Sequence, residues 1–171
     1  MPIIRLSPSH AQAYRALMLD AYARHPEAFT SSVDERAALP LAWWAARLSP
    51  AADALEVVWA AMDDDTIQGV AGLSFERREK VRHKATLFGM YVRPEQRGRG
   101  LGRQLVLAAL AHAQASAGVT QVQLTVTEGN ASAIDLYRSA GFEVWGIEPL
   151  AVRVGEGFVN KQHMWCRLPG R

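Results

Sequence analysis

The stretch of sequence that decides the fold and the function is RPEQRGRGLGR, at residues 93–103. It follows an apolar run that is typical of a strand, and it leads into a long periodic segment that predicts a helix from about Gly100. Gly98, Gly100 and Gly102 allow the backbone to turn tightly and to aim several N–H groups at one point. Because the first turn of a helix also has free N–H groups and a positive partial charge, this turn is suited to binding a phosphate.

The charges around this turn also favour a bound anion. A helix with a purely structural role usually has Asp or Glu in its first turn, where the carboxylate stabilises the helix dipole. Here Arg97, Arg99 and Arg103 surround the helix start, and no acidic residue follows Glu95 within the turn. The alternative interpretation is a glycine-rich turn whose arginines are only solvated.

Two common phosphate-binding motifs do not fit this turn. A Walker P-loop needs a Lys-Ser or Lys-Thr pair after its last glycine, where this sequence has Gln104 and Leu105. A dinucleotide-binding motif has the spacing G-x-G-x-x-G and an acidic residue at the end of the next strand. Here the spacing is G-x-G-x-G, and the next strand ends in Val126 and Thr127.

The composition is that of a soluble globular domain. The 171 residues are 49% hydrophobic and 21% charged, and we expect a single domain over residues 1–171. The net charge of +2 argues against nucleic acid as a partner, and Cys166 is the only cysteine, which excludes an intramolecular disulfide. No long apolar segment is present, so we expect a cytoplasmic protein with no membrane partner.

The order of predicted elements indicates an α/β or α+β domain in three layers with a mixed sheet. Strands of the first half follow one another, whereas those of the second half alternate with helices. We predict strands at 3–6, 55–62, 67–76, 85–92, 120–127, 142–147 and on both sides of 154–158. We predict helices from Ser7 to about Tyr22, two short ones between 25 and 48, one over 100–117 and one from Asn130 to Gly141.

The turn and its flanks resemble the GNAT superfamily of N-acetyltransferases. RGRGLG at residues 97–102 matches the Q/R-x-x-G-x-G/A motif with which that family binds the pyrophosphate of acyl-CoA. GMYVRP at 89–94 and N-x-x-A-x-x-L-Y-x-x-x-G-F at 130–142 are also similar to the family. The resemblance implies a mixed, mostly antiparallel sheet of about seven strands flanked by helices. It also implies a V-shaped splay between the fourth and fifth strands.

The resemblance implies a donor site for acetyl-CoA as co-substrate. The backbone of Met90, Tyr91 and Val92 would pair with the pantetheine arm. The residues that would hold the pyrophosphate are Arg97, Gly98, Arg99, Gly100, Leu101 and Gly102. Asn130 is an expected N-cap that would also contact the cofactor. Tyr137 lies two helical turns further on the same face and would protonate the leaving thiolate, although it is equally suited to the core.

The sequence does not identify the general base. Many family members have a glutamate on the strand before the glycine turn, but residues 85–89 contain no acid. The remaining candidates are Glu76, Glu128 and Glu148, with His83 and His163 as weaker ones. A water relay, or an amine that arrives neutral, would remove the need for a protein base.

We therefore expect an N-acetyltransferase that moves an acetyl group from acetyl-CoA to a primary amine by direct attack in a ternary complex. The alternative is a non-catalytic acyl-CoA-binding sensor or regulatory domain with the same fold. The five histidines have no ligand spacing, so no metal is expected. The acceptor would be a small molecule or a peptide, and a homodimer is possible by analogy with the family.

Overall fold

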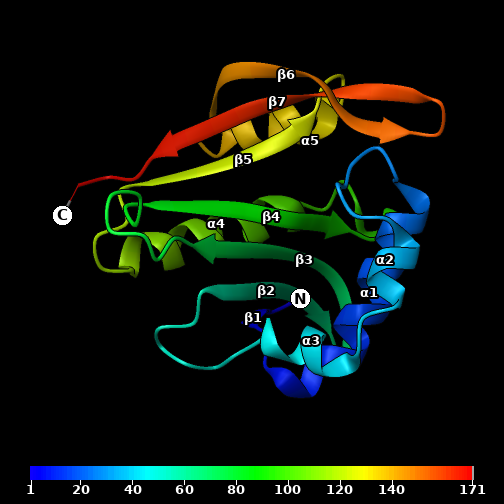
Figure 1. Cartoon of the computed structure of the whole chain (residues 1–171). Coiled ribbons are helices and arrows are strands. Elements are labelled where there is room, and N and C mark those ends of the chain that lie inside the picture. The colour runs from blue at the N-terminus through cyan, green and yellow to red at the C-terminus, as the bar shows by residue number, and fades with distance from the viewer. Residues whose placement is uncertain (171) are drawn as a thin grey trace.

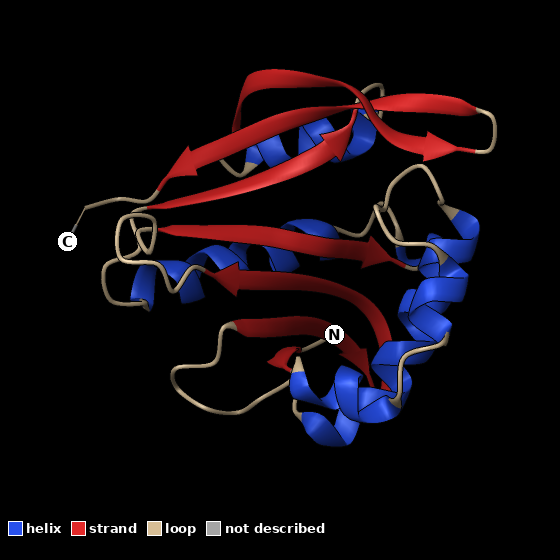
Figure 2. Ribbon diagram, in the orientation of Figure 1, coloured by secondary structure: helices blue, strands red, loops and turns tan. Residues whose placement is uncertain are grey.

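Seven strands form one sheet with the order β1-β2-β3-β4-β5-β7-β6 in this computed structural model, which describes residues 1–170 (Figures 1 and 2). Arg171, the last residue of the predicted domain, lies outside the described residues. The strands are β1 (Ile3–Arg5), β2 (Glu56–Asp63), β3 (Thr66–Phe75), β4 (Lys84–Val92), β5 (Gln121–Thr127), β6 (Glu143–Val154) and β7 (Gly157–Arg167). The α-helices are α1 (Ala11–Arg24), α2 (Val33–Ala37), α3 (Leu41–Ala46), α4 (Leu101–Ala115) and α5 (Ala131–Ser139).

Helices cover both faces of the sheet, and each face has its own core. On one face α4 packs over β2, β3 and β4, because Leu101, Leu105, Ala109 and Ala113 repeat at helical spacing and are all buried. On the other face α1 packs against β3 and β4, next to α3, whose Trp44 is fully buried. Figure 2 shows the central strands between these two helical layers.

The sheet opens between β4 and β5, its only parallel pair. These strands pair only where Lys84–Thr86 lie opposite Gln121–Gln123. There the side-chain amide of Gln123 donates to the hydroxyl of Thr86 at 3.2 Å, and beyond this point the strands diverge (Figure 1). The predicted mixed, mostly antiparallel sheet and its splay between the fourth and fifth strands are confirmed.

The predicted elements differ from the structure mainly at their ends. Ser7 precedes a 3-10 turn over Pro8–His10 instead of capping α1 directly, and α1 continues to Arg24, two residues beyond the expected end. The strand predicted for residues 142–147 continues as β6 to Val154. Its pairing with β7 is interrupted between Glu148 and Val152, where Leu150 takes a positive φ of 51°.

Candidate active site

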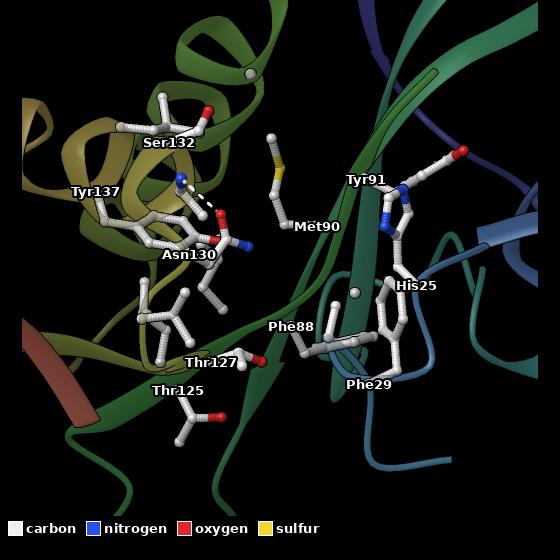
Figure 3. A pocket seen from close by; sticks show the side chains of 18 of the residues that line it. His25, Phe29, Phe88, Met90, Tyr91, Thr125, Thr127, Asn130, Ser132 and Tyr137 are labelled. Atoms are coloured by element: carbon white, nitrogen blue, oxygen red, sulfur yellow. Dashed lines mark hydrogen bonds between the residues drawn. The ribbon is translucent and has the colours of Figure 1, made fainter. Parts of the chain in front are cut away.

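A cavity of about 1030 Å³ occupies the opening between β4 and β5. Its walls are formed by β4, β5, the N-terminal turns of α4 and α5, the loop after α1 and the middle of β7. In Figure 3, Tyr137 and Asn130 lie on one side of Met90, whereas Phe29 and Phe88 lie on the other. The cavity therefore passes from the helix side of the sheet to the opposite face through the splay.

The start of α4 is built to receive an anion at one end of this cavity. Gly98 and Gly100 have φ values of 75° and 76°, which L side chains rarely adopt, and an added Cβ at either position would meet open space. Gly100 is the N-cap, no side chain caps it, and the first turn contains no acid. The free N–H groups of this turn thus point to space that another molecule can fill. Of the three arginines in the predicted charge pattern, Arg97 and Arg103 line the cavity.

Most of the predicted donor residues line the cavity. They are Met90, Tyr91, Val92, Arg97, Gly98, Gly100, Leu101, Gly102, Asn130 and Tyr137, together with Arg103. Arg99 is not among the lining residues, because its guanidinium bonds the side chain of Gln96 at 3.1 Å instead. Gly102 has a packing reason, since an added Cβ would lie 3.1 Å from Leu136 and 3.2 Å from Met90. This glycine therefore lets α4 approach α5 and β4 closely.

Arg97 is held in place by three contacts with its surroundings. Its Nε donates to the carbonyl of Val92 at 3.1 Å, and its Nη2 lies 3.1 Å from Nε2 of His25. The guanidinium also lies over the ring of Tyr91, 5.8 Å from its centroid. These contacts fix a cation beside the start of α4, where it reinforces the positive end of the helix.

The β4 backbone presents N–H groups to the opening. Arg93 donates its amide to the carbonyl of Gln68, so Arg93 and Tyr91 have their amides directed to β3. Because amides alternate along a regular strand, the N–H group of Val92 is directed away from β3, into the splay. Met90 lies in the irregular segment between Phe88 and Tyr91, where the pairing with β3 shifts its register. This arrangement can bind an extended amide chain or polarise a carbonyl oxygen.

Tyr137 and Asn130 both reach the cavity from α5. The ring of Tyr137 is only 6% exposed and points into the cavity toward Asn130 (Figure 3). Burial raises the pKa of the Tyr137 phenol well above its usual value, so the group keeps its proton at neutral pH. Asn130 is the predicted N-cap, and its side-chain oxygen accepts from the amide of Ala133 at 3.2 Å.

Of the five candidate bases, Glu128 and His163 line the cavity, whereas the other three do not. Glu76 bonds Arg78, and neither Glu76 nor His83 lines the cavity. Glu128 lines the cavity, but its carboxylate accepts a hydrogen bond of 2.8 Å from Asn160. Glu148 and His163, which the sequence separates by 15 positions, are brought to 2.7 Å from each other.

The sequence did not single out Lys161 or Trp145, which also line the cavity. Lys161 is 3% exposed and donates to the carbonyls of Glu27 and Ala28 and to the hydroxyl of Thr127. Phe29 and Trp145 also line the cavity. In the sequence, Lys161 lies among the polar residues Asn160, Gln162 and His163, so nothing marks it as a buried position.

The described part of the chain has neither a cluster of three potential metal ligands nor a helix that is long and apolar enough to span a bilayer.

Comparison with known proteins agrees with this geometry. Residues 14–142 match the acetyltransferase (GNAT) family, which is more than half of the chain. This chain belongs to the GNAT family. The prediction from the glycine-arginine turn is thus confirmed at the level of family.

The GNAT chain has curated relatives that match part of its length. It is 53% identical over 57 residues to the mycothiol acetyltransferase of Thermobispora bispora, which is 33% of this chain and 19% of that protein. It is 42% identical over 69 residues to an L-methionine sulfoximine/L-methionine sulfone acetyltransferase of Pseudomonas aeruginosa, 40% of this chain and 38% of that protein. The chain therefore matches about a fifth and about two fifths of the length of these relatives.

Solved structures share the fold over nearly the whole GNAT chain. A GNAT acetyltransferase from Streptococcus pneumoniae superposes with a TM-score of 0.88 at 24% identity, covering 98% of this chain and 99% of that one. The protein yncA of Salmonella typhimurium, solved with its cofactor acetyl-CoA, gives a TM-score of 0.81 at 22% identity, covering 100% and 95%. At these identities the likeness concerns the fold.

Proposed function

We propose that this protein transfers an acetyl group from acetyl-CoA to a primary amine, by direct attack of the amine in a ternary complex. The observation that carries the proposal is the single cavity that joins the acid-free start of α4 to Tyr137 and to the far face of the sheet. A donor held at the helix and an acceptor that enters from the far face would meet in the splay. The names of its relatives, which are acetyltransferases, support the same reaction.

The residues present fit the donor. The uncapped turn with Gly98 and Gly100, together with Arg97, supplies N–H groups and positive charge for a pyrophosphate. The outward amide of Val92 and the irregular backbone at Met90 suit the amide groups of a pantetheine arm. Acetyl-CoA supplies the acetyl group as a thioester, which an amine can attack without a metal.

Each catalytic role is assigned to a group of this chain. An N–H group of the Met90–Val92 segment donates to the carbonyl oxygen as negative charge develops on it. The Tyr137 phenol, protonated at neutral pH, donates its proton toward the leaving sulfur. Asn130 stabilises the start of α5 and thereby fixes the position from which Tyr137 reaches the cavity.

The acceptor is proposed as a small-molecule or peptide amine. Phe29 and Phe88 offer apolar surface on the far side of Met90, and Glu27 adds a carboxylate to the same wall. The L-methionine sulfoximine named for one relative is an acceptor to test. We place the reaction in the cytoplasm and do not require nucleic acid, a membrane or a metal; a homodimer is a further proposal that light scattering can test.

The experiment is a panel of amines assayed with acetyl-CoA. The purified protein is mixed with acetyl-CoA and with L-methionine sulfoximine, L-methionine sulfone, other amino acids, a polyamine or a short peptide, and thiol release is followed. We expect release above hydrolysis with at least one amine and an acetylated product by mass spectrometry. Tight binding of acetyl-CoA by calorimetry with no turnover on any amine would instead favour the non-catalytic sensor.

A further inference from the structure

Glu148 and His163 form a hydrogen-bonded pair, and His163 lines the cavity. His163 Nε2 lies 2.7 Å from Glu148 Oε2, and the side chains are 28% and 51% exposed. Because an ionised carboxylate only accepts hydrogen bonds, the neutral imidazole must carry its proton on Nε2. Nδ1 then has a free lone pair, and no residue among 1–170 makes a hydrogen bond to it.

The strand register places His163 on the face of the sheet opposite α4 and α5. Along β7, Met164 and Cys166 are buried in the core under α4, so His163 and Trp165, which alternate with them, face the other way. His163 lies opposite Thr125 of β5 and opposite Gly146 of β6. It therefore faces the far side of the sheet, next to the strand that forms one wall of the splay.

Packing orients the imidazole. The ring of Trp145 lies 5.1 Å from the ring of His163, and both side chains line the cavity. Glu148 is a diagonal neighbour of His163 across the β6–β7 pair, beside Gly146, which has no side chain to obstruct the contact. Nε2 is thus engaged with β6, while the ring remains part of the cavity wall.

We propose that His163 is the general base of the reaction and that Glu148 is its positioning residue. This inference rests on the proposed acetyl transfer. As the amine nitrogen forms its bond to the thioester carbonyl carbon, its proton passes to Nδ1 of His163, directly or through one water. As the C–S bond breaks, its electron pair goes to sulfur, which takes the proton of the Tyr137 phenol. The imidazolium then returns one proton, through solvent, to the phenolate, and the atoms balance as amide plus free thiol.

The carboxylates that line the cavity already have partners, which favours His163, oriented by Glu148, as the group that accepts the proton. Glu128 is engaged by Asn160, and Glu27 lies 3.5 Å from Nδ1 of His25. Orientation by a carboxylate also prepares a histidine for proton transfer, because it fixes the tautomer and stabilises the imidazolium that forms. The charged groups near His163 are Glu148 on β6, Lys161 on β7 and Glu27 on the facing loop; β5 has no titratable residue.

The test compares His163→Gln and Glu148→Gln with two controls, His83→Gln and Glu143→Gln, which change residues outside the cavity. With the amine found active in the panel, we expect His163→Gln to lower kcat/KM about 10²- to 10³-fold, with an unchanged Kd for acetyl-CoA. The wild-type rate should fall on the acidic side as a histidine protonates. This acidic limb should disappear in His163→Gln, and Glu148→Gln should lower kcat more than it changes KM, because the carboxylate that orients the imidazole is gone.

A measurement on the free protein gives a readout that does not need turnover. In ¹⁵N-edited NMR of the histidine rings, His163 should be the Nε2–H tautomer, and Glu148→Gln should weaken the preference for that tautomer, because an amide can also donate to Nε2. An active wild type with unchanged kcat/KM and acidic limb in His163→Gln would overturn the role of His163 alone. A wild type that releases no thiol with any amine would overturn the proposed function itself.

Discussion

Lys161 and Thr127 form a hydrogen bond of 2.9 Å that joins β7 to the end of β5, and both side chains also donate to the carbonyl of Glu27. Lys161 reaches the carbonyl of Ala28 as well, at 2.9 Å. The loop after α1, which packs with the first half of the sheet, is thereby tied to the second half across the splay. No carboxylate lies within salt-bridge distance of Lys161 in the described residues, and burial lowers the pKa of its ammonium group.

We predict that Lys161→Met loosens this loop without unfolding the protein. The substitution keeps the length of the side chain but leaves the carbonyls of Glu27 and Ala28 without this donor, which costs about 1–3 kcal/mol. Chymotrypsin should cleave at Phe29 about tenfold faster, and KM for the amine should rise more than KM for acetyl-CoA. Lys80→Met, at an exposed position, is the control. Equal cleavage of both variants would show that Lys161 does not hold the loop.

At Gly100, an acidic side chain should abolish donor binding. We expect Gly100→Asp to weaken binding of coenzyme A far more than Gly100→Asn, by about tenfold or more. Both side chains have similar size and experience the same positive φ, and Asn and Asp tolerate that conformation better than other residues. The difference between them therefore isolates the negative charge at the helix start. Calorimetry with coenzyme A measures both, and equal affinities would contradict an anion site at this turn.

Local patterns in the sequence predicted which residues line the cavity from the α4 and α5 side, because these residues are close together along the chain. The turn at 97–102, the cap at Asn130 and the phenol at Tyr137 belong to single strand–helix units, whose geometry follows from glycine, capping and periodicity. The exception is Arg99, whose side chain folds back onto Gln96 within the same turn. Periodicity does not determine the direction of such an exposed side chain.

The acceptor half could not be predicted in the same way. Lys161 contacts the carbonyl of Glu27, 134 positions away in sequence. The pairing of Glu148 with His163 depends on the register of β6 against β7, which shifts at two places. A shift of one residue would turn every side chain of the strand to the other face, so this contact follows from tertiary pairing and not from a motif.

For Tyr137, we predict that removing the hydroxyl affects turnover and not binding. Tyr137→Phe should lower kcat about 10²-fold, because the leaving sulfur loses its proton donor, while Kd for acetyl-CoA stays within about twofold. Tyr14→Phe removes a hydroxyl from a tyrosine buried in the other core, outside the cavity, and should retain activity. Single-turnover kinetics and calorimetry separate the two effects. Full activity of Tyr137→Phe would leave Tyr137 with a packing role only.

The buried tyrosines should also make the protein sensitive to alkali. Burial raises the pKa of both Tyr14 and Tyr137 far above the usual value of 10.0. Above pH 10 the unfolded chain releases these phenolic protons whereas the folded protein retains them, so the unfolded state is favoured as pH rises. Their contribution is fully present below pH 10 and is lost at about 1.4 kcal/mol per pH unit for each tyrosine above it.

Urea unfolding between pH 9 and pH 11 measures this effect. We expect Tyr14→Phe and Tyr137→Phe each to flatten the alkaline decrease in the free energy of unfolding by about 1.4 kcal/mol per pH unit, because phenylalanine has no proton to release. Tyr22→Phe, at a less buried tyrosine, should flatten it less. If neither Tyr14→Phe nor Tyr137→Phe changes the slope, both phenols ionise equally in the two states.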